Sequence, residues 1–500
     1  MKIRTFFKNL FASKDLTTGP VVKGLLIFTV PIFLSYLFQQ FYSLTDAMIV
    51  GQTLSAPEVN GVNNTGSLVF IIMQFAFGCT AGFSVITANK KGAKDANAVR
   101  QSFFVQTVLG IIVSIVLTII ALSSLNPLLG ALGITSTSGL ATYTAAYDYL
   151  FIIFAFTISN VMYNLVCSVL RAIGDSITPL IFLIISTILN IGLDLLFIIP
   201  LKMGVQGAAL ATGIAQTLAA IGAYIYTFIR YKELIFKRED FFIKFKFYKK
   251  HLKLGLPLGF QFSILAVGFI IMQSVIIKFD TLNGVIAENG PAQLGINAAF
   301  KVNNFSITSF SALGTAILSF VGQCKGMNKY DRIRTCIKKS MIISVILMIV
   351  TCAIVLPLTI DGLFLSVFYS ADKITPEAIR YGSLYLWIVT PLMFLLGFLF
   401  IFRSAIQGVK KPKYPLLSGF VELIARIVIA LFVPVLFNNM LPVDATINIL
   451  TTPLPYIGLI LADIGAWIVG TSILGAGVIR HIFLYKGITN TKDEIELTQN

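Results

Sequence analysis

The sequence predicts an all-α membrane protein with twelve transmembrane helices, arranged in two six-helix bundles related by a pseudo-two-fold axis along the membrane normal. Three observations predict this fold. Apolar runs long enough to cross a bilayer recur along the whole chain, basic residues alternate between the loops that join these runs, and motifs of the first half return in the second. Each half has an even number of spans, so both halves run the same way and the axis follows the normal.

The apolar runs are the primary signal for the helices. Of the 500 residues, 56% are hydrophobic and only 12% are charged, whereas a soluble domain keeps about a quarter of its residues charged. Apolar runs of about 18 or more residues are typical of transmembrane helices. We place the twelve spans at residues 24–51, 61–89, 101–123, 141–166, 177–200, 204–229, 255–279, 296–322, 335–358, 380–402, 414–437 and 456–480.

The loops between these spans alternate in charge. Most of the 38 Lys and Arg residues fall in the N-terminal segment, in the loops after even-numbered spans and in the C-terminal tail, whereas the other loops are mainly acidic. The positive-inside rule then places both termini in the cytoplasm. The net charge of +16 is therefore a topology signal and predicts no nucleic-acid partner. Anionic lipid headgroups are the expected partners of these loops.

The placement of charge also suggests domain boundaries. The longest basic loop, residues 230–254, falls at the middle of the chain, and we expect it to be a cytoplasmic linker between bundles at 24–229 and 255–481. Residues 1–23 are basic and amphipathic but lack the apolar core of a signal peptide, which favours a cytoplasmic segment. Residues 482–500 are expected to form a cytoplasmic tail.

The internal repeat is visible in short motifs that keep their order. RAIGDSITPL at 171–180 aligns with QGVKKPKYPL at 407–416, and the same offset aligns YLFI at 149–152 with YLWI at 385–388. Two repeated bundles around a cavity that opens alternately to either side are the expected architecture of a secondary transporter. A channel or a structural bundle needs no such duplication.

With these features, the sequence resembles the multidrug and toxic compound extrusion (MATE) family over nearly its whole length. The resemblance rests on VPIFLSYLFQQFYSLTDAMIVGQTLS (30–55), GFSVITANKKGAKD (82–95), LRAIGDSITPL (170–180) and NIGLDLLFI (190–198). The first and last motifs resemble the DinF-like branch, in which an Asp of the first helix is paired with an Asn-x-x-x-Asp of the fifth. The resemblance implies export of amphipathic, usually cationic drugs, driven by inward flow of H⁺ or Na⁺.

The second half departs from another branch of that family. NorM-type members carry one acidic residue in the seventh helix and another in the tenth. Here the seventh span holds only Gln261 and Gln273 in that role, and the tenth span has no acid. The resemblance therefore does not extend to a C-terminal sodium site.

Four polar residues of the first half lie at matching depth and predict an ion-coupling site. Asp46 and Asp194 each stand about 7 Å before the outer end of their helix, Asn190 lies one turn deeper, and Thr212 lies about 12 Å inside the sixth span. Two close carboxylates repel each other, so the pair binds a proton readily. The two carboxylates, together with the side-chain oxygens of Asn190 and Thr212, also form a set of oxygen ligands suitable for Na⁺. In the alternative interpretation, the two acids only hydrogen-bond neighbouring helices or face a water-filled vestibule.

Other polar residues are candidates for contact with an exported molecule. The candidates are Gln39, Tyr42, Asn160, Tyr163, Asn164 and Asp463. Gln39 and Tyr42 share a helix face with Asp46, although Gln also joins helices and Tyr also anchors span ends at the interface. The expected cargo is an amphipathic cationic small molecule, bound by aromatic faces and adaptable Met side chains.

The second half replaces the acids of the first. The repeat places apolar residues at both acidic positions, Met272 for Asp46 and Ala430 for Asp194. It places Arg426 at the position of Asn190 and Asp463 at that of Thr212. We predict that Arg426 is neutralised by Asp463, by Glu422 one turn back on its own helix, or by both, in a structural ion network of these three residues. In the alternative, Asp463 helps to bind cationic substrate.

No motif of enzymatic or ATP-driven chemistry is present. The sequence contains no GxxxxGK[ST], HExxH, GxSxG or CxxC pattern, so we expect a transporter rather than an enzyme, without cofactor or metal centre. A monomer is the expected state. One alternative from the same superfamily is a flippase for lipid-linked oligosaccharides, whose anionic pyrophosphate would need several cationic residues in the cavity. The acids of the first half argue against it.

Overall fold

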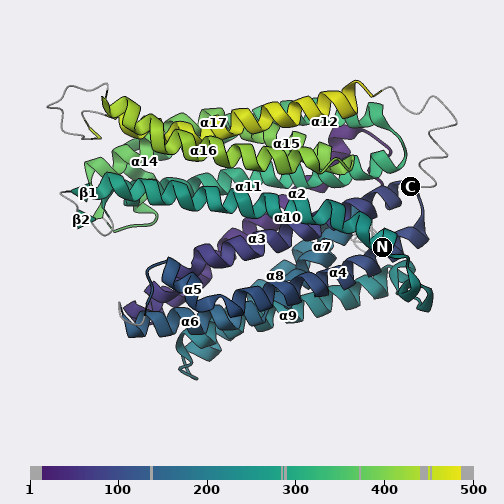
Figure 1. Ribbon diagram of the computed structural model, residues 1–500, viewed down its shortest axis with the longest axis horizontal. Coiled ribbons are helices and arrows are strands. Elements are labelled where there is room, and N and C mark those ends of the chain that lie inside the picture. Colours follow the sequence, from purple (N-terminus) through teal and green to yellow (C-terminus); the bar gives the residue numbers. More distant parts are fainter. Residues whose placement is uncertain are drawn as a thin grey trace, which may run out of the picture.

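The computed structural model describes residues 14–135, 139–282, 285–286, 290–370, 373–439, 449–450 and 453–485. Long helices dominate these ranges (Figure 1). The first half forms α2 (Val21–Thr53), α3 (Ala56–Gly92), α4 (Ala96–Ser123), α5 (Leu125–Ala131), α6 (Leu140–Ala155), α7 (Thr157–Ile173), α8 (Ile177–Ile198) and α9 (Gly204–Arg230).

The second half begins with two short 3-10 helices and continues with long helices. These are η1 (Lys232–Leu234), η2 (Arg238–Phe242), α10 (Phe245–Ile276), η3 (Ile277–Asp280), α11 (Pro291–Gly326), α12 (Tyr330–Val355), η4 (Pro357–Gly362), α13 (Leu363–Ser366), α14 (Pro376–Val389), η6 (Thr390–Leu392), α15 (Met393–Gly408), α16 (Lys413–Asn439), α17 (Leu454–Val478) and η7 (Ile479–Phe483). Two short strands, β1 (Thr281–Leu282) and β2 (Val285–Ile286), pair antiparallel between η3 and α11.

The long helices correspond to the predicted spans. When residues 376–408 (α14, η6 and α15) are counted as one helix, 11 helices of the described residues are long and apolar enough to cross a membrane. The pair α6–α7, bent by 46°, makes a twelfth if it is taken as one span. The largest difference is at α10, which begins at Phe245 and so extends into the predicted linker 230–254. The residues before the apolar run include several Lys, which are good helix formers. The helix therefore continues beyond its apolar part.

The helices form two bundles, with α3 to α9 in one and α10 to α17 in the other (Figure 1). The bundles meet mainly through α2 and α3 of the first half and α10 and α11 of the second. Helix α2 packs on α8 of its own half and on α11 of the other. A movement of α2 therefore reaches both bundles.

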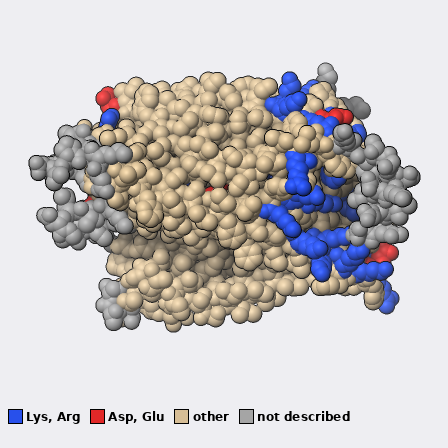
Figure 2. All heavy atoms as spheres, turned by 45° about the horizontal axis from the view of Figure 1, so that its top comes forward, with Lys and Arg blue, Asp and Glu red and all other residues tan. Residues whose placement is uncertain are grey.

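The surface charges are concentrated at one end of the molecule. Figure 2 shows Lys and Arg gathered there, where α3, α11 and α15 end near Lys91, Lys325 and Lys411. We call this the basic end. The flanks of the helices expose many large apolar side chains, as expected for surfaces in contact with lipid. On the face seen in Figure 2, the surface between the bundles is hollowed on the side away from the basic end.

Helices α3 and α10 cross the boundary between the bundles at a pair of glycine motifs. A Cβ atom on Gly82 would lie 2.6 Å from the Cα of Gly255, and one on Gly78 would lie 2.8 Å from the Cα of Gly259. Glycines spaced four residues apart let the two backbones approach closely, as in other membrane helix pairs. No larger residue fits this crossing without separating the helices.

Two hydrogen bonds related by the repeat close the basic end. Asn89 Nδ2 of α3 donates to the carbonyl of Gly408 in α15 at 3.3 Å, and Gln323 Nε2 of α11 donates to the carbonyl of Ala172 in α7 at 2.9 Å. The alignment of 171–180 with 407–416 makes Ala172 correspond to Gly408. KKG at 90–92 aligns with CKG at 324–326 in the same way, which makes Asn89 correspond to Gln323. We call these two bonds the basic-end latch. Each one joins the two bundles.

The segment before α2 crosses the same end. The Lys14 amide donates to the Gly174 carbonyl at 2.8 Å, and the Leu16 amide donates to Gln323 Oε1 at 3.1 Å. Arg332 of α12 donates to the Leu16 carbonyl at 3.0 Å. The segment therefore contacts both bundles. Residues 1–13 and 486–500, most of the predicted N-terminal segment and tail, lie outside the described residues.

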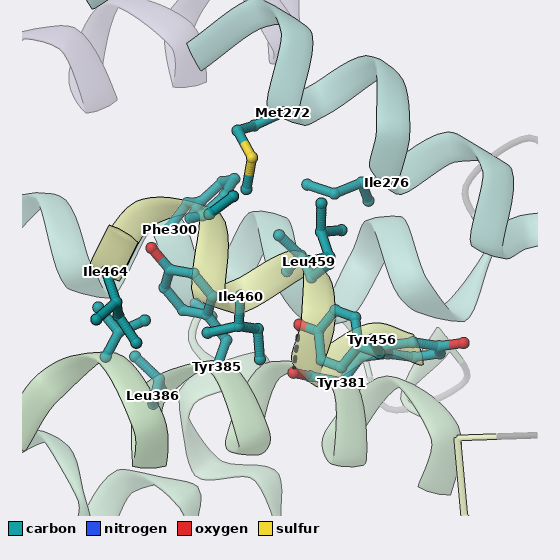
Figure 3. Close-up of a cluster of buried hydrophobic side chains, with 14 of the residues drawn as sticks. Met272, Ile276, Phe300, Tyr381, Tyr385, Leu386, Tyr456, Leu459, Ile460 and Ile464 are labelled. Carbon is teal, nitrogen blue, oxygen red and sulfur yellow. Dashed lines mark hydrogen bonds between the residues drawn. The ribbon is translucent and has the colours of Figure 1, made fainter. Parts of the chain in front are cut away.

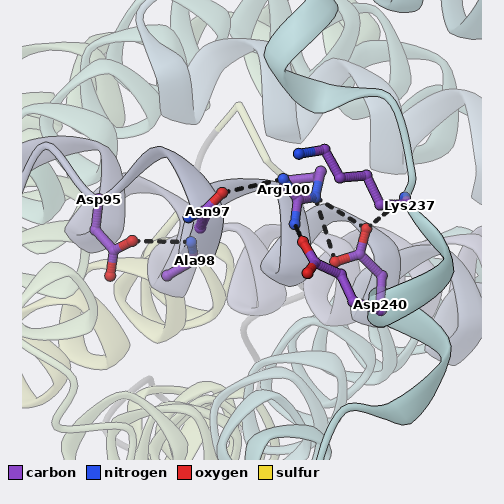
Figure 4. Close-up of polar contacts among 7 residues, drawn as sticks. Asp95, Asn97, Ala98, Arg100, Lys237 and Asp240 are labelled. Carbon is purple, nitrogen blue, oxygen red and sulfur yellow. Dashed lines mark hydrogen bonds and ion pairs between the residues drawn. The ribbon is translucent and has the colours of Figure 1, made fainter.

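The connection between the bundles is anchored to α4 (Figure 4). Arg100 Nε donates to Asp240 Oδ2 at 3.0 Å, and the Lys237 amide donates to the same oxygen at 2.8 Å. The Arg100 side chain also contacts Glu239. Asp240 is fully buried, so this ion pair fixes η2 against the first bundle.

Candidate functional site

The residues predicted to couple an ion come together where α2, α8 and α9 meet. Asp194 and Asn190 of α8 are buried, and Asp46 of α2 is partly buried. The carboxyl groups of Asp46 and Asp194 lie within hydrogen-bonding reach of each other. Asn190 Nδ2 donates to Thr212 Oγ1 at 3.3 Å. Matched depth along three helices therefore brings all four side chains into one cluster.

Tyr42 belongs to the same cluster. Its hydroxyl lies 3.3 Å from Thr212 Oγ1, so Thr212 contacts both α2 and α8. Tyr42 and Asp46 are one turn apart and share a face of α2, as their spacing predicts. Gln39, another predicted substrate contact on this helix, has an exposed side chain.

The oxygens of the cluster lack hydrogen-bond donors. Among the described residues, neither carboxylate oxygen of Asp194 receives a hydrogen bond, and the same holds for Asp46 Oδ1 and Asn190 Oδ1. Two ionised carboxylates have no donor to share, because both are acceptors only. One proton on the pair supplies the missing donor, and a bound cation would also satisfy these oxygens.

Sequence reasoning missed Tyr149 of α6, which lies near both Asp46 and Asp194. The internal repeat is the signal that identifies it. Tyr149 aligns with Tyr385, and Tyr385 donates to Asp463 at 3.3 Å in the second bundle. Each half therefore places the equivalent tyrosine beside its acidic cluster.

The other predicted substrate contacts of the first half bond within their own bundle. Asn160 Nδ2 donates to Gln216 Oε1 at 2.9 Å, and Asn164 Nδ2 donates to Asn160 Oδ1 at 2.9 Å. The Tyr163 hydroxyl donates to the Pro179 carbonyl at 3.2 Å. These bonds join α7 to α9 and to α8.

In the second bundle, Arg426 is paired with Asp463. Arg426 Nη2 lies 3.0 Å from Asp463 Oδ1, while Asp463 Oδ2 accepts the bond from Tyr385. Asn303 Nδ2 in turn donates to the Tyr385 hydroxyl at 3.3 Å. Asp463 is one of the two partners that the sequence predicts for Arg426, and this ion pair joins α16 to α17.

Glu422 does not join that pair. Both of its oxygens accept from Nη2 of Arg403 in α15, at 2.9 and 3.0 Å, and Ser418 also donates to it. Glu422 is 2% exposed and Arg403 is 4% exposed. Sequence reasoning missed Arg403 because it follows an apolar run and was counted with the basic loop. Arg403 points instead into the protein, where Glu422 neutralises it.

The second half has an apolar core where the first half has its acids. Met272, the equivalent of Asp46, is buried near Phe300 (Figure 3). Ala430, the equivalent of Asp194, is buried in the same cluster. Among the described residues, the two halves share a fold, but the second has no carboxylate pair at this position.

These features define a class of protein. Two repeated helix bundles meet along a few central helices and close at the basic end, and among the described residues only the first half holds the carboxylate pair. This is the organisation of a multi-pass membrane transporter. The MatE family model matches residues 31–196 and 257–432, one segment in each half, and the chain belongs to this family of transporters.

Similar proteins agree with this assignment. The chain is 25% identical over 430 residues to a probable multidrug resistance protein NorM of Thermotoga maritima, which covers 84% of this chain and 86% of the relative. It is 28% identical over 322 residues to a probable multidrug resistance protein YpnP of Bacillus subtilis, covering 64% and 68%. A solved structure described as the outward-facing conformation of a multidrug resistance MATE family transporter has the same fold. Its TM-score is 0.80 at 19% identity, covering 94% of this chain and 98% of that one.

Proposed function

We propose that this protein exports amphipathic organic cations across the bacterial cytoplasmic membrane in exchange for H⁺ or Na⁺, with Asp46 and Asp194 as the coupling pair. The observation that carries the proposal is the contact between two carboxyl groups whose buried oxygens lack donors among the described residues. A buried pair of this kind needs a proton or a cation. The names of the relatives in B. subtilis and T. maritima, both probable multidrug resistance proteins, support the choice of cargo.

In this proposal the basic end faces the cytoplasm, in line with the positive-inside rule. The basic-end latch then closes the cytoplasmic side, and the hollow between the bundles opens outward. The conformation is therefore outward-facing, the state in which the pair takes up its ion and the cargo leaves.

Uptake of the ion changes how α2 packs. A proton on one carboxyl allows Asp46 and Asp194 to share a hydrogen bond, which draws α2 toward α8. With Na⁺, the oxygens of Asn190 and Thr212 complete the ligand set. Because α2 also packs on α11 of the other bundle, this shift alters the space between the bundles. The ion and the drug are coupled because each binds the two states with different affinity.

The test is ethidium efflux from cells that express the native chain, Asp46→Asn or Asp194→Asn. We expect both variants to lose efflux down to the background of cells without the transporter. Asp148→Asn is the matched control. Asp148 is an acid of the same bundle whose carboxylate accepts from Gln206 at 2.9 Å in exposed surroundings, so this variant should keep efflux close to native. Full efflux in both site variants would refute the assignment of the pair.

The coupling ion is identified with the purified protein in proteoliposomes. Separately imposed proton and sodium gradients should show that one of them drives uptake of the cation and that the response is lost in Asp194→Asn. A native protein that moves no organic cation, together with defective envelope assembly in a deletion strain, would instead favour a lipid-linked oligosaccharide flippase.

A further inference from the structure

A cavity lies at the junction of the two bundles, apart from the carboxylate pair of Asp46 and Asp194. It has a volume of about 60 Å³ and is lined by α3, α7, α10, α11 and α15. Two arginines, Arg171 and Arg403, line it together with hydroxyl groups and aromatic rings. No acidic residue is among the described residues that line it.

The cavity lies at the pseudo-two-fold axis, next to the basic-end latch. Ser168 of α7 and Ser404 of α15 are equivalent in the repeat, and both line it. Arg171 immediately precedes Ala172, whose carbonyl accepts the latch bond from Gln323. The cavity therefore lies between the two bundles, directly beside the latch bonds at the basic end.

The two arginines differ in their electrical surroundings. Arg403 is neutralised by Glu422, although its Nε has no partner among the described residues. Arg171 is 7% exposed, and within the described residues no side chain or carbonyl accepts a hydrogen bond from its guanidinium or forms an ion pair with it. Burying a charge costs several kcal/mol unless a counter-charge is supplied.

The nearest acid along the chain does not supply that charge. Asp175 lies one turn beyond Arg171, but its Oδ1 accepts from the amides of Ile177 and Thr178. Its Oδ2 accepts from the hydroxyls of Thr178 and Tyr231. Asp175 thus begins α8 and anchors α9, and it forms no ion pair with Arg171.

The hydroxyl groups around Arg171 are also free. Ser168, Ser319 and Ser404 are buried, and none of them has a hydrogen-bond partner among the described residues. The aromatic rings of Phe77 and Phe262 pack edge to face at 5.7 Å beside this group. The cavity therefore combines an unpaired guanidinium, free hydroxyl donors and aromatic faces.

We propose that Arg171 binds an oxyanion, a carboxylate or a phosphate, that is part of the exported molecule. A guanidinium donates two parallel hydrogen bonds to such a group, and the serine hydroxyls complete its coordination. The cavity volume matches one small charged group, so the aromatic body of the cargo lies along Phe77 and Phe262. This role of Arg171 rests on the proposed function. It restricts the exported molecules from organic cations in general to aromatic zwitterions.

The structural alternative is that Arg171 only stabilises the end of α7. A cation in the last turn of a helix interacts favourably with the helix dipole. That role explains the position of Arg171 but leaves the free serines and the acid-free cavity without a purpose. It also predicts no dependence of ligand binding on the charge of the ligand.

The test uses two fluorescent dyes that differ only in an anionic group. Rhodamine 110 carries a free carboxylate beside its cationic ring system, and rhodamine 123 is its methyl ester. Fluorescence anisotropy with purified protein should show the free acid bound about tenfold more tightly than the ester, as expected for a charge-assisted hydrogen bond. Arg171→Gln should abolish this preference and leave the affinity for the ester unchanged.

Two further variants keep the test decisive if Arg171→Gln folds poorly. Arg171→Lys keeps the charge but not the paired donors, and should retain only part of the preference. Ser168→Ala should weaken binding of the free acid alone. Lys411→Gln removes one positive charge from an exposed position outside the cavity, and as the matched control it should behave as native.

Three results would overturn the proposal. The first is a native protein that binds the ester as tightly as the free acid. The second is a preference that survives in Arg171→Gln. The third is binding of inorganic phosphate that depends on Arg171 without any discrimination between the dyes, which would assign the site to a free counter-ion. Efflux of the ester dye by the native chain and its loss in Asp46→Asn report separately on the proposed coupling pair.

Discussion

At the residue scale, some buried charges are neutralised by a partner of opposite charge and others are not. Arg403 and Glu422 neutralise each other inside the second bundle, at distances of 2.9 and 3.0 Å. Arg426 and Asp463 form a second pair that is slightly more exposed. Asp194 in the first bundle has no cationic partner among the described residues. The pairs hold helices together, whereas the unpaired acid is available for an ion.

The pair of Arg403 and Glu422 gives a stability prediction. Glu422→Gln leaves the guanidinium buried without a counter-charge, which costs about 3–5 kcal/mol. We expect a lower melting temperature in detergent, measured with the purified protein. Arg403→Gln should have a comparable effect, and the double variant should lose less than the sum of the two single variants. Additive losses would show that the two residues do not stabilise each other.

The site residues also show what the sequence predicts at this scale. Asp46, Asn190, Asp194 and Thr212 could be brought together from depth alone, because helices of known direction fix the height of each side chain. The contacts of other buried side chains could not be predicted from depth. The partner of an arginine such as Arg403 depends on the rotation of each helix about its axis, which packing decides.

At the scale of elements, the apolar runs predict every long helix, but they do not show which helices approach closely. The crossing of α3 and α10 depends on glycines whose backbones nearly touch. Hydropathy also places the start of α10 too late, because the Lys-rich turns before the apolar run remain helical. The length of a helix and the length of its apolar part are therefore separate quantities.

The crossing predicts different outcomes for two identical substitutions in one helix. In Gly82→Ala the new methyl group would lie 2.6 Å from the Cα of Gly255, and neither backbone can yield without separating α3 from α10. We expect a clear loss of thermal stability and of transport. Gly66→Ala, also in α3, meets no atom within 4 Å and should keep the native melting temperature. Equal effects of the two variants would contradict the close crossing.

At the scale of the whole molecule, the repeat produces a symmetric closure around an asymmetric pair of bundles. The latch bonds from Asn89 and Gln323 are equivalent, and so are the serines of the central cavity. Among the described residues, the carboxylate pair of Asp46 and Asp194 and the unpaired Arg171 both occur in the first half. Symmetry thus supplies one closing bond from each half at the same end, while the first half differs from the second in its buried charged groups.

The latch should therefore control which end is open. Asn89→Ala and Gln323→Ala each remove a hydrogen bond between the bundles, worth about 1 kcal/mol, so the double variant should shift the equilibrium toward the state open at the basic end by more than tenfold. Spin labels at Lys94→Cys and Lys411→Cys, on opposite bundles, should then show a larger population of long distances when measured by double electron–electron resonance.

Gln323→Ala alone should act more strongly than Asn89→Ala, because Gln323 also accepts from the Leu16 amide and its bond to Ala172 is shorter. Asn164→Ala removes an amide bonded only within the first bundle, and as a control it should leave the distances unchanged. Native distances in the double variant would mean that helix packing, and not these bonds, keeps the basic end closed.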